Sequence, residues 1–236
     1  MYKRQIAGEN GEALATVERY DRAADAWEDV APLAVARTHP GVLTVDDRLI
    51  VYGGELLSAE DAANGARDEA RPPVVRELEV YDDAAQRWES YGMLPWSRRE
   101  TRMQLFAAFA LAVGGGAGGG ARREQLHILF GRGAADDDDY YRGERPPALA
   151  RYDERTRQWR ALAPMHSIPT DVLGWSVRGD VAYVGVKDNA TPARLVVERY
   201  CAGENAWRVV GSPVPLDVAD HDDEVPFGIA TLWAAE

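Results

Sequence analysis

The chain has 236 residues, a length that suits one all-β domain of repeats or two small domains. Its net charge of −12 argues against a nucleic-acid partner, because that field repels a phosphate backbone. No apolar run approaches the ~18 residues of a membrane-spanning helix, and no apolar segment of a signal peptide follows the N-terminus. Cys201 is the only cysteine, so the sequence predicts a cytoplasmic protein without disulfides.

A tyrosine and a tryptophan seven residues apart occur four times along the chain. The intervals between successive tyrosines are 61, 71 and 48 residues, whereas the inner spacing never varies. This pattern indicates one supersecondary unit that is repeated, with insertions confined to its loops. The four pairs are Tyr20–Trp27, Tyr81–Trp88, Tyr152–Trp159 and Tyr200–Trp207.

Each tyrosine ends a short run of alternating apolar and polar residues, which predicts a half-buried strand. A polar turn follows, and an aspartate at its start suits it because the carboxylate can accept backbone N–H groups two residues on. Asp21, Asp82 and Asp153 hold this place, and Cys201 replaces the aspartate in the fourth repeat. The tryptophan then begins a second strand; the four strand pairs are predicted at 15–20 and 27–30, 77–81 and 88–91, 148–152 and 159–162, and 195–200 and 207–210.

A second predicted hairpin lies between successive Tyr/Trp pairs. Its strands span 41–45 and 48–54, then 105–113 and 125–131, then 172–177 and 181–185. The glycine run at 114–120 is interpreted as a hairpin tip, because a phosphate-binding loop needs a Lys-Ser/Thr pair and a following helix. Each repeat is therefore predicted to be a four-stranded antiparallel sheet, the blade of a propeller.

These motifs resemble kelch repeats, most closely the kelch domain of BTB–kelch (kelch-like) adaptor proteins. The segment from Val17 to Gly54 carries the resemblance best, with Tyr-Asp, Trp, Ala-Pro-Leu and the double glycine Gly53-Gly54. In the next two repeats, Gly131-Arg132-Gly133 and Val184-Gly185-Val186 stand in place of the double glycine. The resemblance covers nearly the whole chain and implies a kelch-type β-propeller in which the Tyr/Trp pairs pack between blades.

The two ends of the chain each look like part of one further blade. Residues 225–236 resemble a first strand, and residues 1–30 supply the remaining strands, so we expect a composite blade that closes a four-blade ring. The other blades are predicted at about 35–91, 98–162 and 166–210. The alternative is a fragment of a larger propeller.

The resemblance also indicates where a partner would bind. Family members often carry an arginine ten residues after the tryptophan, which binds carboxylates of a target segment. Arg37 and Arg98 stand at this position in the first two repeats, and Arg99 and Arg102 lie near Arg98 in the sequence. In the last two repeats the arginine is replaced by Pro169 and Asp217. The alternative is that these arginines cap loop carbonyls or pair with nearby acids. Further candidate binding residues on the same loops are His39, Trp96, His166 and His221.

A run of acids, Asp136, Asp137, Asp138 and Asp139, lies in a long loop of the second repeat. A solvated loop is the simple interpretation, and a contact for a basic partner segment is the alternative. The run lacks the glycine-containing spacing of an EF-hand, and His221 among acids near 217–224 is a weak metal pattern. We expect no metal and no cofactor.

The sequence thus predicts a protein-interaction module that binds a target protein or peptide. The resemblance further implies the substrate-recognition part of a ubiquitin-ligase adaptor, reaching a cullin-type ligase through a BTB domain that this sequence lacks. The alternatives are a kelch-propeller enzyme, a metal oxidase or a sugar-modifying enzyme, and an inactive truncated propeller. An enzyme is disfavoured because the four histidines fall in different repeats. His127 lies within a predicted strand and is expected to serve packing.

Overall fold

The computed structural model describes residues 13–56, 74–95, 103–114, 123–132, 149–167, 171–188 and 194–215. Every regular element in these ranges is a β-strand, which confirms the predicted all-β class. None of them holds a helix long and apolar enough to cross a membrane. The chain divides into two compact units, Met1–Thr101 and Arg102–Glu236, and each is described by itself.

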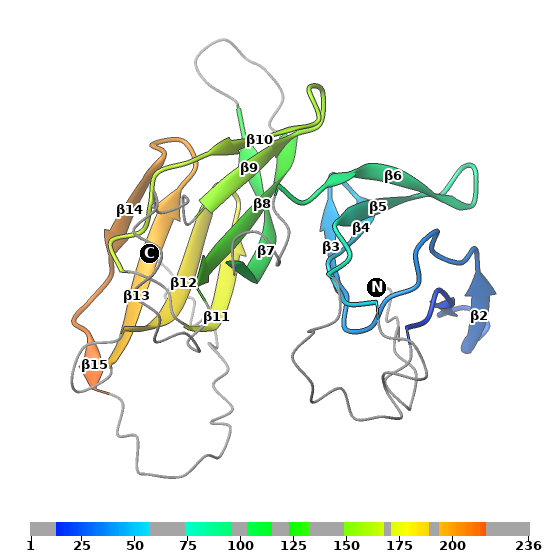
Figure 1. The fold of residues 1–236 in the computed structure, drawn as a ribbon, viewed down its shortest axis with the longest axis horizontal. Coiled ribbons are helices and arrows are strands. Elements are labelled where there is room, and N and C mark those ends of the chain that lie inside the picture. Colours follow the sequence, from blue (N-terminus) through cyan, green and yellow to red (C-terminus); the bar gives the residue numbers. More distant parts are fainter. Residues whose placement is uncertain are drawn as a thin grey trace. The chain divides into compact units, whose positions relative to one another are not determined.

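Unit 1 contains a two-stranded and a four-stranded antiparallel sheet (Figure 1). The small sheet pairs β1 with β2, and in the larger one the strands lie in chain order, as in a propeller blade. The strands are β1 (Val17–Asp21), β2 (Ala26–Val30), β3 (Gly41–Val45), β4 (Arg48–Tyr52), β5 (Glu77–Asp82) and β6 (Arg87–Met93).

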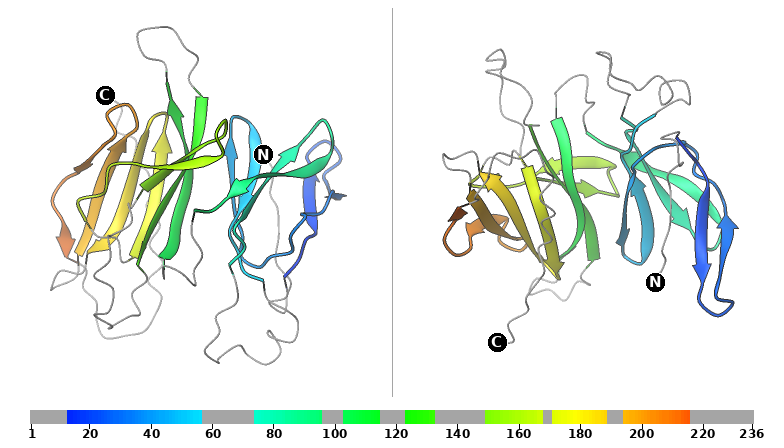
Figure 2. Two further views of the ribbon diagram at one scale, coloured as in Figure 1. Left: turned by 45° about the horizontal axis from the view of Figure 1, so that its top comes forward. Right: turned by 90° about the horizontal axis from the view of Figure 1, so that it is seen from below.

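Unit 2 contains two larger antiparallel sheets, which Figure 2 shows from two further directions. Their orders, β7-β8-β9-β10 and β11-β12-β13-β14, again follow the chain, with β15 beside β13. The strands are β7 (Met103–Val113), β8 (Arg123–Arg132), β9 (Leu149–Asp153), β10 (Gln158–Ala161), β11 (Asp171–Arg178), β12 (Val181–Asp188), β13 (Arg194–Cys201), β14 (Ala206–Val209) and β15 (Val214–Pro215).

The predicted hairpin between each tyrosine and its tryptophan is confirmed in all four repeats. The two residues face each other across the strand pair, with ring centroids 5.0–5.4 Å apart. In three repeats, the carboxylate of the aspartate after the tyrosine accepts hydrogen bonds from the backbone amides two and three residues further on. These aspartates are Asp21, Asp82 and Asp153. These amide hydrogen bonds, chiefly that from Thr156, lower the pKa of the Asp153 carboxyl.

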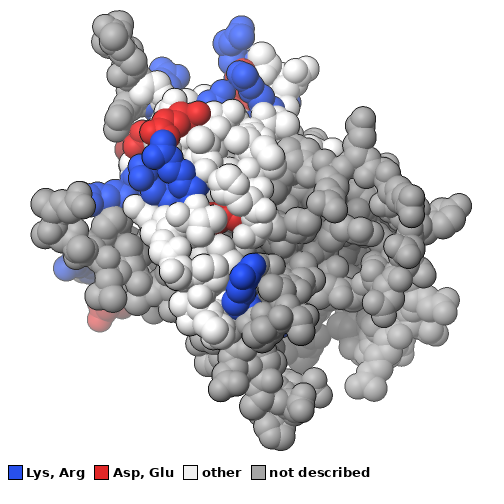
Figure 3. All heavy atoms as spheres, turned by 90° about the vertical axis from the view of Figure 1, so that its left-hand side faces the viewer, with Lys and Arg blue, Asp and Glu red and all other residues white. Residues whose placement is uncertain are grey.

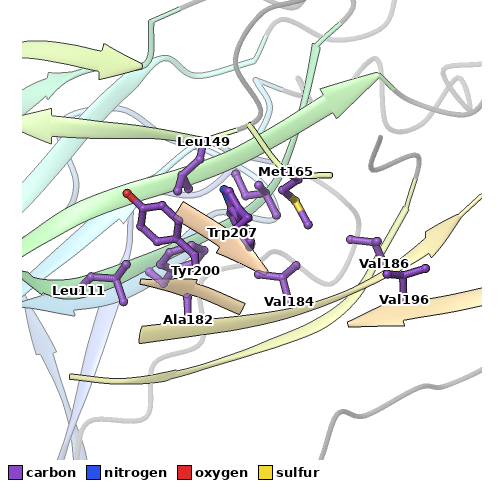
Figure 4. Packing of buried hydrophobic residues seen from close by; sticks show 12 residues of the cluster. Leu111, Leu149, Met165, Ala182, Val184, Val186, Val196, Tyr200 and Trp207 are labelled. Atoms are coloured by element: carbon purple, nitrogen blue, oxygen red, sulfur yellow. The ribbon is translucent and has the colours of Figure 1, made fainter. Parts of the chain in front are cut away.

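The cores form where one sheet packs against the next within each unit. In unit 1, Val17 and Leu33 pack with Val51, Tyr81 and Trp88. In unit 2, apolar residues of both sheets surround Tyr200 and Trp207, as Figure 4 shows for the labelled Leu111, Leu149, Met165, Ala182, Val184, Val186 and Val196. The prediction that the aromatic pairs serve packing therefore agrees with the structure for Tyr81–Trp88 and Tyr200–Trp207, whereas Trp27 of the first pair is 47% exposed.

The predicted composite blade lies largely outside the described residues. Within the described ranges, β1 and β2 form a sheet of two strands, and the segments expected to complete it, 225–236 and the start of 1–30, are not described. Closure of a four-blade ring therefore stays a prediction.

Candidate functional site

Two buried glutamates occupy the same place in the repeat, two residues before a tyrosine. Glu79 on β5 is 1% exposed and Glu198 on β13 is fully buried. A buried carboxylate is costly unless hydrogen bonds compensate it. Each of these carboxylates accepts two backbone amides from a loop that follows the outer strand of the preceding sheet.

The two loops are held in equivalent ways. The amide nitrogens of Ala34 and Val35 lie 2.7 and 3.4 Å from the Glu79 carboxylate oxygens. Those of His166 and Ser167 lie 2.9 and 2.6 Å from the Glu198 carboxylate oxygens. In both cases the amides belong to the seventh and eighth residues after a tryptophan. The glutamate therefore anchors the loop that leaves the neighbouring sheet.

Arg37 adds a guanidinium to this anchor in unit 1. Its side chain is fully buried and forms an ion pair with Glu79. Its Nη1 donates to the carbonyls of Gly53 at 3.2 Å and Glu77 at 3.0 Å, and its Nε donates to that of Val35 at 3.2 Å. Burial lowers the pKa of Arg37, and the charges of Glu79 and Glu77 oppose that shift. The arginine thus joins the loop, β5 and the double glycine.

The double glycine makes room for the same loop. Gly54 has a φ of +87°, and a Cβ there would lie 2.5 Å from the carbonyl oxygen of Thr38. Thr38 and Glu55 exchange backbone hydrogen bonds of 2.9 and 3.0 Å across this point. A side chain at position 54 would break this contact, which explains the glycine physically.

Unit 2 keeps the glutamate but has no arginine in the corresponding place. The residue ten positions after Trp159 is Pro169, which lies outside the described residues and has no guanidinium to offer. Among the described residues, no basic side chain forms an ion pair with Glu198. His166 instead adds a ring contact, with its Nε2 3.0 Å from the carbonyl oxygen of Trp207.

The candidate residues from the sequence fall into three groups. Arg37 is buried and pairs with Glu79. This corresponds to the alternative interpretation, in which the arginine caps carbonyls and pairs with a nearby acid instead of binding a partner. His39 and His166 are exposed on the two anchored loops, and His39 has a φ of +46°. The remaining candidates lie outside the described residues: Trp96, Arg98, Arg99, Arg102, Asp136, Asp137, Asp138, Asp139 and His221.

The sequence reasoning missed the glutamates, although a signal existed. A glutamate stands two residues before the tyrosine in three of the four repeats, at positions 18, 79 and 198. An acid that recurs at an inward position of a strand indicates a buried partner. The partner, a pair of loop amides, carries no mark in the sequence.

His127 is a buried packing residue, as expected. It is fully buried on β8, its ring stacks on Phe109 with centroids 6.1 Å apart, and its Nδ1 lies 2.8 Å from the Gln125 carbonyl oxygen. Burial lowers its pKa to about 4, opposed by the Gln125 carbonyl and helped by the Arg151 charge. Within the described part of the chain, no group of three or more potential ligands could hold a metal ion.

No family model matches the chain. A segment of 48 residues is similar to Kelch-like protein 38, with 50% identity to the mouse, 46% to the rat and 42% to the human protein. The similarity covers 20% of this chain and 8% of each relative's length. It supports kelch-like character at the level of the repeat, together with the antiparallel four-stranded sheets.

Proposed function

We propose that the chain is a kelch-type protein-interaction module and that the loops after the outer strands bind a target protein or peptide. For the loops after β2 and β10, the observation that carries the proposal is their anchoring by Glu79 and Glu198. Loops fixed before binding lose less conformational entropy on association. The anchored loops present His39 and His166 to solvent, where a partner can reach them.

The partner segment is acidic in this proposal, and Arg98 is the residue that binds it. Arg37 is paired with a glutamate two residues before the next tyrosine, and the residue in that position relative to Arg98 is Ala150. In the sequence, the repeat that follows Arg98 therefore lacks the glutamate that pairs with Arg37 in unit 1. A guanidinium without an internal acid can bind a target carboxylate in bidentate fashion. Arg99 and Arg102 add to the local positive charge.

The resemblance to BTB–kelch adaptors extends this proposal to a cellular role. In that role the chain recognises the substrate in the cytoplasm. A BTB domain, on another polypeptide or on another segment of the same protein, links it to the cullin-type ligase. The similarity to Kelch-like protein 38 over the 48-residue segment supports this proposed role. The interaction proposal does not depend on the ligase role.

A quantitative pull-down with paired variants tests the interaction. Arg98→Glu/Arg99→Glu reverses the proposed contact, and Arg87→Glu/Arg208→Glu reverses two exposed arginines that pair only with surface acids. The proposal predicts that partners recovered with wild type and with the control variant disappear with Arg98→Glu/Arg99→Glu. Equal recovery with all three proteins would contradict it. Arg37→Glu is unsuitable, because it would bury two carboxylates together and unfold the protein.

A further inference from the structure

The hairpin of β9 and β10 is the most basic of the four Tyr/Trp hairpins. The β1–β2 hairpin has two arginines against five acids, the β5–β6 hairpin one against five, and the β13–β14 hairpin three against two. The β9–β10 hairpin has four arginines against two acids: Arg151, Arg155, Arg157 and Arg160 against Asp153 and Glu154. In a chain with a net charge of −12, this hairpin is a local basic surface.

Two of these arginines face each other across the strand pair. Arg160 on β10 is directly opposite Arg151 on β9, so both side chains lie on the same face of the sheet. Like charges in directly opposite positions destabilise a strand pair. Among the residues that the structure describes, no acid forms an ion pair with either guanidinium. Asp153, the acid on the same face, accepts the amides of Arg155 and Thr156 at 2.9 and 3.2 Å.

The first and the fourth repeats supply an acid at this place. Arg19 is directly opposite Glu28, and its Nε donates to the Glu28 carboxylate at 2.6 Å. In the fourth repeat Arg208 is opposite a second arginine, Arg199, but it pairs with Glu204 at 2.8 Å. Figure 3 faces the side of β14, where acidic and basic side chains lie next to each other. An arginine on this face therefore takes a carboxylate wherever the repeat offers one.

Thr156 explains why the third repeat offers none. It stands where Glu204 stands in the fourth repeat, four residues before the arginine of the outer strand. Thr156 is exposed and carries no charge. The third repeat thus has the arginine of the fourth without its carboxylate, and the exposed Arg160 guanidinium keeps its capacity to bind one.

We propose that Arg151 and Arg160 bind a carboxylate of an acidic segment of a partner protein, and that Arg155 and Arg157 extend this contact along the turn. The planar guanidinium suits a carboxylate, and an anion between the two arginines removes their repulsion. The partner is a protein segment rather than a nucleic acid, because a long polyphosphate would extend into the field of a chain with a net charge of −12. The site lies on β9 and β10, apart from the loops of the proposed function.

Fluorescence anisotropy of a labelled octaglutamate peptide, titrated with the full chain, tests the proposal. The parent protein carries Arg98→Gln/Arg99→Gln, so the arginines of the proposed function contribute nothing. We expect the parent to bind octaglutamate and not a neutral Gly-Ser peptide of equal length. Arg160→Gln should weaken binding about tenfold, as expected for a lost hydrogen bond between charged groups. Arg208→Gln is the matched control at the same position of the next repeat, and it should bind like the parent because Glu204 already holds Arg208.

Thr156→Glu provides an independent test, because it copies the internal acid of the fourth repeat into the third. The new carboxylate should pair with Arg160, as Glu204 pairs with Arg208, and weaken octaglutamate binding about tenfold. Thr156→Gln has a side chain of the same size without the charge and should bind like the parent. Circular dichroism checks that each variant is folded.

Three results would overturn the proposal. The first is a parent protein that binds octaglutamate no better than the neutral peptide. The second is an equal loss of affinity with Arg160→Gln and Arg208→Gln, which would indicate general attraction to arginine. The third is an oligonucleotide of the same charge that binds more tightly than octaglutamate and depends equally on Arg160, which would assign a nucleic acid to the site. None of these results bears on the pull-down with the Arg98 variant.

Discussion

The two units anchor their loops with the same buried glutamate, but only unit 1 adds an arginine. Glu79 binds two loop amides and Arg37, whereas Glu198 binds two loop amides alone among the described residues. The amides are therefore the constant part of the anchor. The ion pair is an addition that also fixes the carbonyls of Gly53 and Glu77.

The acid that pairs with Arg37 is not repeated at every corresponding position of the sequence. Arg37 meets a carboxylate 42 residues further along the chain and becomes part of the interior. In the repeat that follows Arg98, the sequence has Ala150 at the position of that glutamate. The same motif position therefore serves the fold in one repeat and, in our proposal, partner binding in the next.

The largest expected effect comes from breaking the anchor of unit 1. Arg37→Met removes the guanidinium and leaves the Glu79 carboxylate buried, which should cost about 3–5 kcal/mol in the free energy of unfolding. Urea denaturation measures the loss. Arg87→Met, in an exposed ion pair with Glu89, is the control and should change nothing measurable. A loss as small as that of the control would show that Arg37 is not part of the core.

A second contrast between the units depends on pH. His127 of unit 2 and Ile50 of unit 1 hold the same register position, opposite the residue before a tyrosine, and both are fully buried. The His127 pKa is about 4 when folded against 6.5 otherwise, so the unfolded chain takes up the proton first as pH falls. Stability is full above pH 6.5 and should fall by about 3 kcal/mol towards pH 4.

His127→Ile copies unit 1 into unit 2 and isolates this effect. The variant should lose the part of the pH dependence between 6.5 and 4 and should melt at a higher temperature than wild type at pH 4. Calorimetry at several pH values provides the measurement. Identical pH profiles for the two proteins would exclude His127 as the cause.

A smaller effect is expected from the glutamate of unit 2. Glu198→Gln keeps one acceptor for the loop and breaks no ion pair among the described residues, so it should cost about 1 kcal/mol. Glu79→Gln strands a buried guanidinium and should cost about 3 kcal/mol or more. Urea denaturation of both variants compares them directly. Equal losses would mean that the two anchors do not differ as described.

The smallest effect concerns the turn that differs between repeats. Cys201→Asp restores the acid that accepts two turn amides in the other three repeats, which should stabilise the protein by about 0.5–1 kcal/mol. Thermal melting in the presence of a reductant measures the gain. A lower melting temperature would show that the fourth turn is built differently.

The sequence predicted the strands well because their signals are local. Alternating residues, the Tyr/Trp spacing and the turn aspartates all act within one hairpin, and β1 to β14 follow them closely. The anchor could not be predicted in the same way, since Glu79 binds amides 44 and 45 residues away. Backbone amides have no sequence signature, so the anchoring role of Glu79 could not be predicted. The burial of Arg37 was therefore only one of two interpretations, the other being that it binds a partner. Ring closure depends on residues that lie outside the described ranges.

Hydrogen exchange at the two anchored loops tests the central claim most directly. The claim predicts that the amides of Ala34, Val35, His166 and Ser167 exchange slowly in the wild type. Glu198→Ala should speed exchange at His166 and Ser167 and leave Ala34 and Val35 protected. If His166 and Ser167 exchange equally in both proteins, the buried glutamate does not hold the loop, and the account of the site is wrong.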